Sequence, residues 1–374
     1  MLISHIWPRA LSFVIFQLGE LGWIAMDAFF VLSGFLITGI LLDTRSRPDY
    51  FRSYYTRRTL RIFPLYYLTL VLAVLMMKIS HGGSEYRTFV HDWGSPAWFF
   101  LYLGNFRMAY LAKWPPTWSF TVFWSLQIEE QFYLLFPFAV RYLRRDHLVH
   151  LLWCLVFLSP IFRLAFYLWN PDNLVVQYVL LPCHMEGLAL GALIAIRFRS
   201  GAWEISKPKL TLLTAGLLLV TCAGSLMSKA PSPGLSTFSR LPGYSLASWA
   251  SACLVVWLIV FRGSRYTRLF RTSAVGYMAT ISYGLYLLHP LVMRFVRSDG
   301  KIGLHMFRRT LASFAVEVIL TIVAASLSWF LLERPLARLK DRLAPNRLAL
   351  EPTDPPAHEQ PVADDRALPE PAEA

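Results

Sequence analysis

Long runs of apolar residues constrain this chain more than any other feature of its sequence. A run of about 20 apolar residues is long enough to cross a bilayer as a helix. Such runs recur along the 374 residues, of which 56% are hydrophobic and only 16% are charged, whereas a soluble globular chain carries about 25% charged residues. The sequence therefore predicts an all-α integral membrane protein. It excludes a disordered chain, a fibre or an ordinary cytosolic enzyme for most of the length.

The predicted spans amount to about ten transmembrane helices when a partial first helix is included. Met1–Trp7 reads as the end of an apolar helix, because no basic region precedes it as in a signal peptide. We therefore expect the first helix to be truncated at the N-terminus, or its start to be misplaced. The complete spans are expected near 23–42, 62–78, 122–141, 147–168, 178–197, 210–228, 244–261, 274–293 and 310–332.

The net charge of +13 indicates membrane topology and not a nucleic-acid partner. Cytoplasmic loops of membrane proteins carry an excess of Lys and Arg. The basic clusters all fall on one side only if the short apolar segment 96–111 does not cross, so we expect it to be re-entrant or to lie at the outer face. Both ends of the complete protein are then cytoplasmic. The clusters lie within 45–61, 141–145, 197–209, 262–271 and 334–342.

The chain divides into a membrane domain, 1–343, and a tail, 344–374, that is rich in Pro, Ala and acidic residues and has no aromatic residue. This composition predicts a disordered cytoplasmic tail. The cysteines lie in or beside apolar runs without metal-ligand spacing, so we expect no disulfide and no metal site. They are Cys154, Cys183, Cys222 and Cys253.

Ionisable groups inside the predicted spans are candidate functional residues, because they are costly in a bilayer. His5 has the side chain best suited to move a proton near neutral pH, although a structural hydrogen bond across helices explains it equally well. Asp27 lies early in its helix, where a position at the outer interface is the simpler explanation. Arg58 and Arg61 share a helical face and have the chemistry to bind phosphate, but topology and lipid headgroups explain an arbitrary arginine cluster more simply.

Two adjacent carboxylates, Glu129 and Glu130, lie inside the expected span 122–141. Adjacent helical residues point about 100° apart, so at most one of them faces a given polar cavity squarely. A functional role is favoured, because no simple membrane anchor requires this cost. For Glu333, an ion pair with Arg334 or Arg338 near the C-terminal end of the membrane domain is a strong alternative to a functional role. The remaining candidates are His184, Glu186, His289 and Glu333.

These segments together resemble acyltransferase family 3, the integral-membrane O-acyltransferases that modify bacterial polysaccharides, lipopolysaccharide, Nod factors and some antibiotics. FFVLSGFLITGILL (29–42) is similar to the second-helix signature of that family, and RRTLRIFPLYY (57–67) resembles its RxxR element. WSLQIEEQFYLLFP (124–137) is similar to its WSLxxEEQFYLLxP stretch. The resemblance runs from His5 to about Arg338, and the remaining blocks follow in order as LPCHMEGLALGAL, ISYGLYLLHP and LLERP.

The resemblance implies roles for individual residues. His5 corresponds to the histidine proposed as catalytic base or shuttle, and Arg58 and Arg61 correspond to the pair proposed to hold acyl-CoA from the cytosolic side. Two departures bear on activity: the basic residue expected eleven positions before the histidine falls before Met1, and an arginine often seen in the family is His184 here. A third, Ala25-Met26-Asp27-Ala28 for Gly-Val-Asp-Leu, is mild. Further matched positions are Glu129, Glu130, Tyr133, Ser282, Tyr283 and His289.

The family therefore implies an O-acyltransferase of the bacterial inner membrane. Acyl-CoA, acetyl-CoA by default, would be the co-substrate, and a hydroxyl of a surface glycan or lipid-linked glycan would be the acceptor. A transporter or flippase of lipid-linked glycans is one alternative, but no internal repeat of the kind common in transporters is present. A degenerate, non-catalytic family member is another, and the two departures that bear on activity favour it slightly. Acceptor identity, acyl length and oligomeric state stay open.

Overall fold

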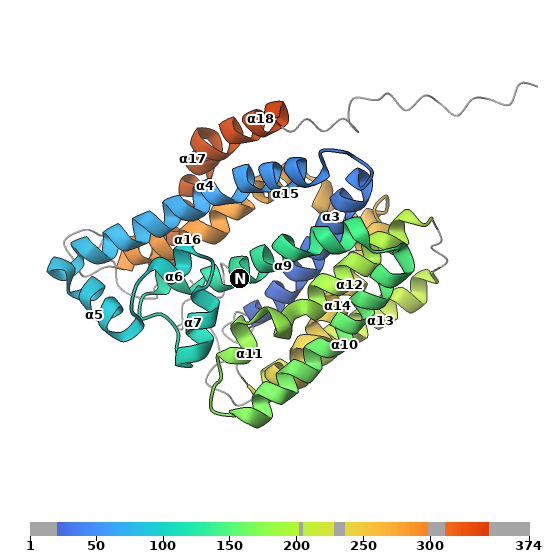
Figure 1. Ribbon diagram of the computed structural model, residues 1–374, viewed down its shortest axis with the longest axis horizontal. Helices are drawn as coiled ribbons and strands as arrows, with labels where there is room; N and C mark the ends of the chain where they lie inside the picture. The colour runs from blue at the N-terminus through green and yellow to red at the C-terminus, as the bar shows by residue number, and fades with distance from the viewer. Residues whose placement is uncertain (1–20, 202–204, 228–235, 298–310, 344–374) are drawn as a thin grey trace, which may run out of the picture.

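The computed structural model describes residues 21–201, 205–227, 236–297 and 311–343, and all regular elements in these ranges are helices (Figure 1). The predicted all-α class is confirmed. Within the same ranges, seven stretches are helical, long and apolar enough to cross a membrane. The chain is therefore a multi-pass membrane protein. The seven are Leu21–Thr44, Tyr50–Ile79, Arg145–Trp169, Val176–Arg199, Lys207–Met227, Ser239–Val260 and Ala312–Leu339.

Two further predicted spans are helical but differ from these seven. Helix α9, Phe123–Tyr142, is continuous over 20 residues, and its polar residues 127 and 129–131 lower its apolar content. The expected span 274–293 is divided at Ile281 into α15, Ser273–Thr280, and α16, Ser282–Arg297. The partial first helix at Met1–Trp7 lies outside the described residues.

Segment 96–111 does not form one spanning helix, as the distribution of basic residues predicted. It contains α6, Ala97–Phe100, and α7, Gly104–Leu111. The eight residues of α7 rise about 12 Å, which is well short of the hydrocarbon thickness of about 30 Å. Tyr102, between them, has a left-handed backbone with φ of 58°. Helix α5, Ser84–Trp93, precedes this segment.

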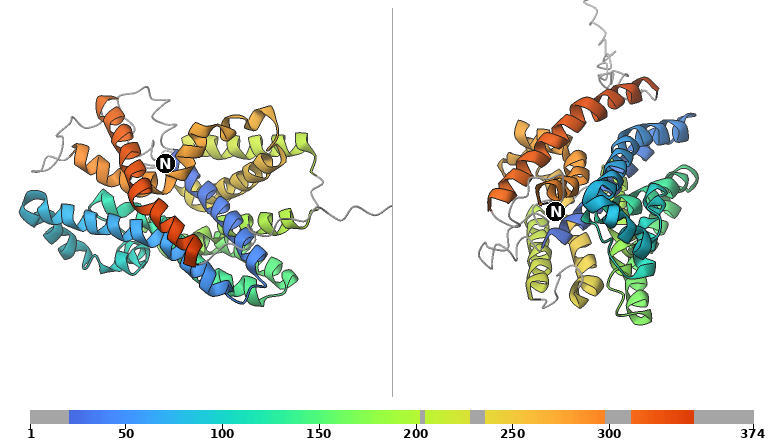
Figure 2. Two further views of the ribbon diagram at one scale, coloured as in Figure 1. Left: turned by 90° about the horizontal axis from the view of Figure 1, so that it is seen from above. Right: turned by 90° about the vertical axis from the view of Figure 1, so that its left-hand side faces the viewer.

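Helix α3, Ile24–Thr44, occupies the middle of the molecule. In Figures 1 and 2 it passes between a group that includes α4, Tyr50–Ile79, and α16, and a group that includes α12, Leu181–Arg199. The second group also contains α10, Arg145–Trp169, α13, Lys207–Met227, and α14, Tyr244–Val260. Helices α17, Leu311–Ser328, and α18, Arg334–Leu343, lie beside α4 and α16.

Small residues let α3 and α12 approach closely. A Cβ atom added to Gly34 would overlap the carbonyl of Leu188, and one added to Gly191 would overlap the carbonyl of Val31. Close backbone contact through small residues is a common way for membrane helices to associate. These glycines therefore fix the position of α3, which carries residues of the candidate site.

Gly191→Ala is expected to destabilise the protein by about 3 kcal/mol, because the new methyl group meets rigid backbone and overpacking of this kind costs about 1–3 kcal/mol. Gly216→Ala on α13 is the matched control, since a Cβ there meets nothing within 4 Å and alanine is the better helix former. The melting temperature in detergent should fall for Gly191→Ala and be unchanged or higher for Gly216→Ala. Equal shifts for the two variants would contradict the close packing of α3 and α12.

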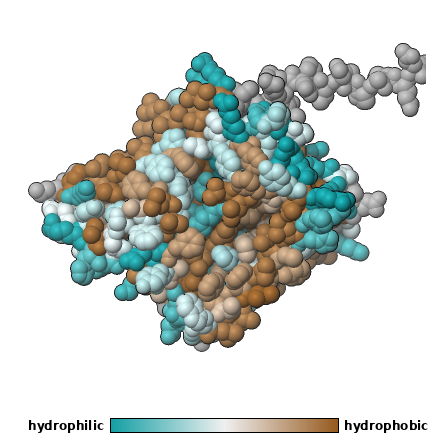
Figure 3. Space-filling model, in the orientation of Figure 1, coloured by the Kyte–Doolittle hydropathy of each residue, from teal (hydrophilic) through white to brown (hydrophobic). Residues whose placement is uncertain are grey.

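The surface agrees with a membrane environment. In Figure 3 apolar residues cover much of the visible face, and hydrophilic residues gather toward its right-hand edge, where α3 and α9 end in Figure 1. Exposed apolar side chains recur along the long helices, including Leu36 on α3 and Leu212 on α13. Lipid would cover such side chains at no hydrophobic cost.

Candidate active site

The adjacent carboxylates of α9 lie in the interior and take different partners. Glu129 is 3% exposed, and the hydroxyl of Ser33 on α3 donates a hydrogen bond to it. Ser33 also hydrogen-bonds the hydroxyl of Tyr133, one turn further along α9. The two acids point in different directions, as the helical geometry required. Glu129 thus faces α3.

Glu130 faces α4 and pairs with Arg58. The Nε atom of Arg58 donates to Oε1 of Glu130 at 3.1 Å, and Nη2 lies 3.1 Å from the same oxygen. The guanidinium carbon of Arg58 is 3.2 Å from the ring centroid of Tyr133, in a cation–π contact. We call these residues the carboxylate cluster, because Arg58 contacts Glu130 and Tyr133 while Ser33 joins Glu129 to Tyr133. It consists of Ser33, Arg58, Glu129, Glu130 and Tyr133.

Arg58 and Arg61 have different surroundings although they are three residues apart. The side chain of Arg58 is 14% exposed, whereas Arg61 is classed as exposed. Arg61 interacts electrostatically with Glu333, whose carboxylate accepts a hydrogen bond of 2.9 Å from Ser328. Glu333 takes these partners instead of the ion pair with Arg334 or Arg338 that its sequence position suggested. The two arginines therefore differ in exposure and in partner.

Asp27 is buried between helices, where it takes protein partners. It is 2% exposed, and the hydroxyl of Ser248 on α14 donates to it at 3.0 Å. Nδ1 of His184 on α12 lies 3.8 Å from the same carboxylate. Nε2 of His184 is 2.9 Å from the carbonyl of Tyr178, which can only accept, so this nitrogen carries a proton. Trp124, the first residue of the 124–137 motif, packs beside the imidazole.

Glu186 forms a second buried ion pair, away from the carboxylate cluster. Nη2 of Arg163 on α10 is 2.7 Å from its carboxylate, and the Ser245 hydroxyl donates to the same oxygen at 2.8 Å. Arg163 and Glu186 are 1% and 2% exposed. Arg163 also donates to the carbonyl of Cys183 at 2.8 Å. This pair joins α10, α12 and α14 and is structural.

The candidates on α16 form hydrogen bonds with backbone carbonyls. Tyr283 donates to the carbonyl of Ile62 on α4 at 2.7 Å. Pro290 has no N–H for the carbonyl of Tyr286, and Nδ1 of His289 replaces it at 2.7 Å. Ser282 is exposed and donates to the carbonyl of Ala279 at 2.8 Å. The structure does not bring these three side chains into the carboxylate cluster, and His5 lies outside the described residues.

Buried amides hold the non-crossing segment against α9. Gln131 donates to the carbonyl of Tyr102 and to the side-chain oxygen of Asn105, both at 3.0 Å. Gln127 accepts from the backbone N–H of Asn105 at 2.6 Å. Irregular backbone at membrane depth needs protein partners of this kind. Burial raises the pKa of Tyr102 above its ordinary value, so its hydroxyl stays protonated beside this network.

Sequence reasoning missed several residues that complete these sites. The predicted site residues did not include Ser33, Arg163, Ser245 or Ser248. Arg163 carried a usable signal, because a charged residue within an apolar run already implies a buried partner. The serines carried none, since a hydroxyl in a membrane helix commonly bonds the carbonyl four residues earlier.

Helices that enclose two carboxylates and a paired guanidinium define an integral membrane protein with a polar site in its interior. Comparison with known proteins gives this class a family. A family model described as an acyltransferase domain matches residues 1–333, and the chain belongs to that family, acyltransferase family 3.

The relatives are distant and longer. The O-acetyltransferase OatA of Staphylococcus aureus (strain NCTC 8325 / PS 47) is 23% identical over 336 residues, which cover 85% of this chain and 53% of that protein. A putative O-acetyltransferase of strain COL, SACOL0978, is 24% identical over 346 residues with the same coverage of each chain. The chain thus spans about half the length of the curated relatives it matches. No solved structure matches it.

Proposed function

We propose that this protein is an O-acyltransferase of the bacterial inner membrane, which transfers an acyl group, acetyl by default, from cytosolic acyl-CoA to a hydroxyl of an exported glycan or lipid-linked glycan. The observation that carries the proposal is the carboxylate cluster. Arg58, Glu130 and Tyr133 are in contact in the interior of a chain that belongs to an acyltransferase family. Two distant relatives named as O-acetyltransferases support the choice of an oxygen acceptor.

The roles follow from the chemistry of each residue. His5 takes the proton of the acceptor hydroxyl while the oxygen attacks the thioester carbonyl. The carbon–sulfur bond then breaks, and His5 returns the proton to the departing sulfur. General-base help of this kind contributes about 10²–10⁴-fold. This role rests on the family resemblance of His5.

The residues present fit an acyl-CoA that enters from the cytosolic side. Arg61 is exposed and offers a guanidinium group to it. Arg58 is less exposed and is held by Glu130, so we assign it to the reacting end of the donor and not to its phosphate groups. Glu129, which bonds Ser33, orients the histidine or the acceptor. Asp27 and His184 border this region through Trp124.

His5→Ala is expected to lower acyl transfer by about 10²–10⁴-fold. The assay supplies radiolabelled acetyl-CoA and extracted surface glycan to membranes that contain the protein. His147→Ala is the control, because that histidine is exposed at the start of α10. A second variant, Arg58→Ala/Arg61→Ala, tests the donor side and should also abolish label in the glycan.

The outcomes separate the alternatives. Label that survives His5→Ala would remove the catalytic role of His5. Movement of lipid-linked glycan across the membrane without consumption of acetyl-CoA would favour a transporter. A non-catalytic family member would be favoured if cells carrying His5→Ala and cells carrying the arginine double variant both kept the phenotype that the wild-type protein supports.

A further inference from the structure

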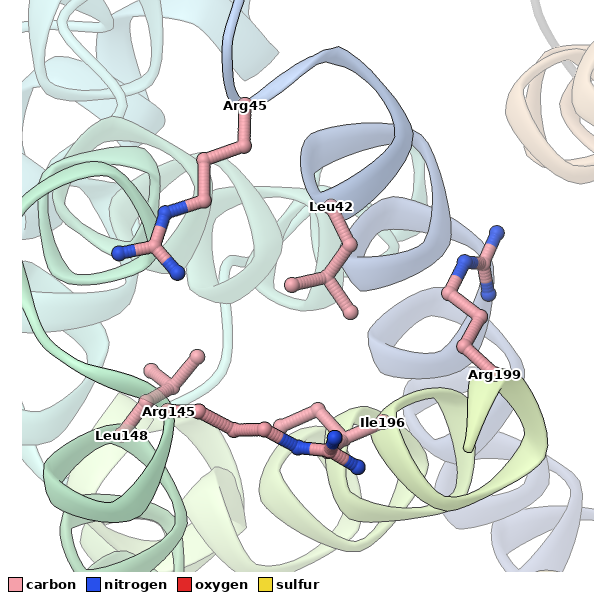
Figure 4. A pocket seen from close by; sticks show the side chains of 6 residues that line it. All are labelled: Leu42, Arg45, Arg145, Leu148, Ile196 and Arg199. Carbon is pink, nitrogen blue, oxygen red and sulfur yellow. The ribbon is translucent and has the colours of Figure 1, made fainter. Parts of the chain in front are cut away.

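A basic pocket opens between the ends of α3, α10 and α12, apart from the carboxylate cluster (Figure 4). Its volume is about 170 Å³. Arginines rim it and aliphatic side chains form its walls. The lining residues are Leu42, Arg45, Arg145, Leu148, Ile196 and Arg199.

The three arginines differ in whether an acidic side chain neutralises their positive charge. Arg199 pairs with Asp43 through bonds of 2.7 and 2.6 Å, and in Figure 4 its guanidinium points away from the centre. Arg45 donates through Nη2 to the carbonyl of Leu143 at 2.6 Å, which leaves its positive charge uncompensated. Arg145 is exposed and, within the described ranges, makes no hydrogen bond or ion pair. Two cations therefore face the opening.

This combination selects a class of ligand. Guanidinium groups bind phosphate oxygens in paired hydrogen bonds, and basic pockets between membrane helices on the cytoplasmic side bind phosphate headgroups. Leu42, Leu148 and Ile196 give the same pocket apolar walls. The ligand is thus a phosphate ester that also carries apolar or weakly polar parts.

The pocket lies on the same helix as the carboxylate cluster. Leu42 and Ser33 are nine residues apart on α3, which is about 14 Å of axial rise. Arg58 is engaged with Glu130, so the phosphate groups of a donor that reaches the cluster need cations other than Arg58. A long ligand with its phosphates in the pocket and its far end at Glu129 satisfies both sites.

We propose that this pocket binds the phosphate groups of an elongated amphipathic ligand, with Arg45 and Arg145 as the binding residues. The proposal rests on the proposed function in so far as it identifies the ligand as acyl-CoA. The headgroup of an anionic phospholipid has the same chemistry and is the other source of phosphate.

The test compares Arg145→Gln with Arg144→Gln, an adjacent exposed arginine that does not line the pocket. The purified protein is placed in nanodiscs of phosphatidylcholine, and equilibrium binding of radiolabelled coenzyme A is measured without any acceptor. Arg145→Gln should weaken binding about tenfold, as expected for one lost charge-assisted contact. Arg144→Gln should stay within about twofold of wild type, because only long-range, screened electrostatics change.

A second arm identifies the source of the phosphate. Nanodiscs with added phosphatidylglycerol are washed, and the phospholipid retained by the protein is quantified. Loss of retained phosphatidylglycerol in Arg145→Gln, with coenzyme A binding unchanged, would support the pocket as a lipid site. Wild-type values for Arg145→Gln in both arms would overturn the pocket, whether or not the protein transfers acyl groups. Coenzyme A binding that depends on Arg145 in a protein inactive toward glycans would keep the pocket and count against the proposed function.

Discussion

Replacing Glu130 by glutamine is expected to lower acyl transfer by about 10²–10³-fold while the protein still folds. The amide keeps the shape of the side chain but leaves the buried guanidinium of Arg58 without the carboxylate that holds it at 3.1 Å. Removing one partner of a buried pair costs about 3–5 kcal/mol. Part of that cost appears as a misplaced Arg58 at the reacting end of the donor. The measurement is kcat and KM for acetyl-CoA in membranes, with the melting temperature as a check on folding.

Asp172→Asn is the control for this variant, because Asp172 is exposed in the loop after α10 and lies outside the carboxylate cluster. It should keep more than about half of wild-type activity, as usual for a substitution away from the features that dominate mutational effects. A double-mutant cycle of Glu130→Gln and Arg58→Gln adds a second test of whether the two residues act together. If Arg58 and Glu130 act as one unit, the double variant will be no worse than the more damaging single one. Near wild-type kcat and KM in Glu130→Gln would show that the ion pair is not needed for transfer.

Arg163→Ala is expected to destabilise the protein by about 3–5 kcal/mol, because it strands the carboxylate of Glu186 in the interior. Arg163 is 1% exposed and is also bonded to the carbonyl of Cys183, so a polar backbone group loses its partner as well. The midpoint of thermal unfolding in detergent should fall accordingly. Arg268→Ala, in an exposed loop between α14 and α15, should leave the midpoint unchanged.

A double variant, Arg163→Leu/Glu186→Leu, distinguishes the pair from mere loss of packing. Replacing a whole buried ion pair by apolar residues is often neutral or stabilising, whereas removing one partner is not. The double variant should therefore recover much of the stability that Arg163→Ala loses. A double variant at least as unstable as the single one would show that the arginine acts mainly through its carbonyl bond and its volume.

The apolar runs determined the membrane class and located the long helices, because length and hydrophobicity are enough to predict a spanning helix. The distribution of basic residues predicted that 96–111 does not cross the membrane. The family followed from the order of the motifs, and the match over residues 1–333 confirms it.

Which face of each helix meets protein and which meets lipid was decided only by the tertiary structure. Lipid is as apolar as leucine, so hydropathy does not distinguish the two environments. Helices α12 and α17 are both strongly apolar, yet the span containing α12 is mostly buried and the one containing α17 is mostly exposed. For the same reason the sequence could not show that Asp27 faces other helices and not lipid.

The candidate site was predicted in part. The sequence identified Glu129, Glu130 and Arg58, because charged residues stand out in an apolar run. It could not pair Glu130 with Arg58, 72 positions away, or find Arg163 as the partner of Glu186. It also left Arg145 as one more topology charge until α3, α10 and α12 brought it to a pocket. Sequence alone determined which residues are costly to bury. Only the packing of the helices decided which groups offset that cost, because those partners are far apart along the chain and meet only when the helices associate.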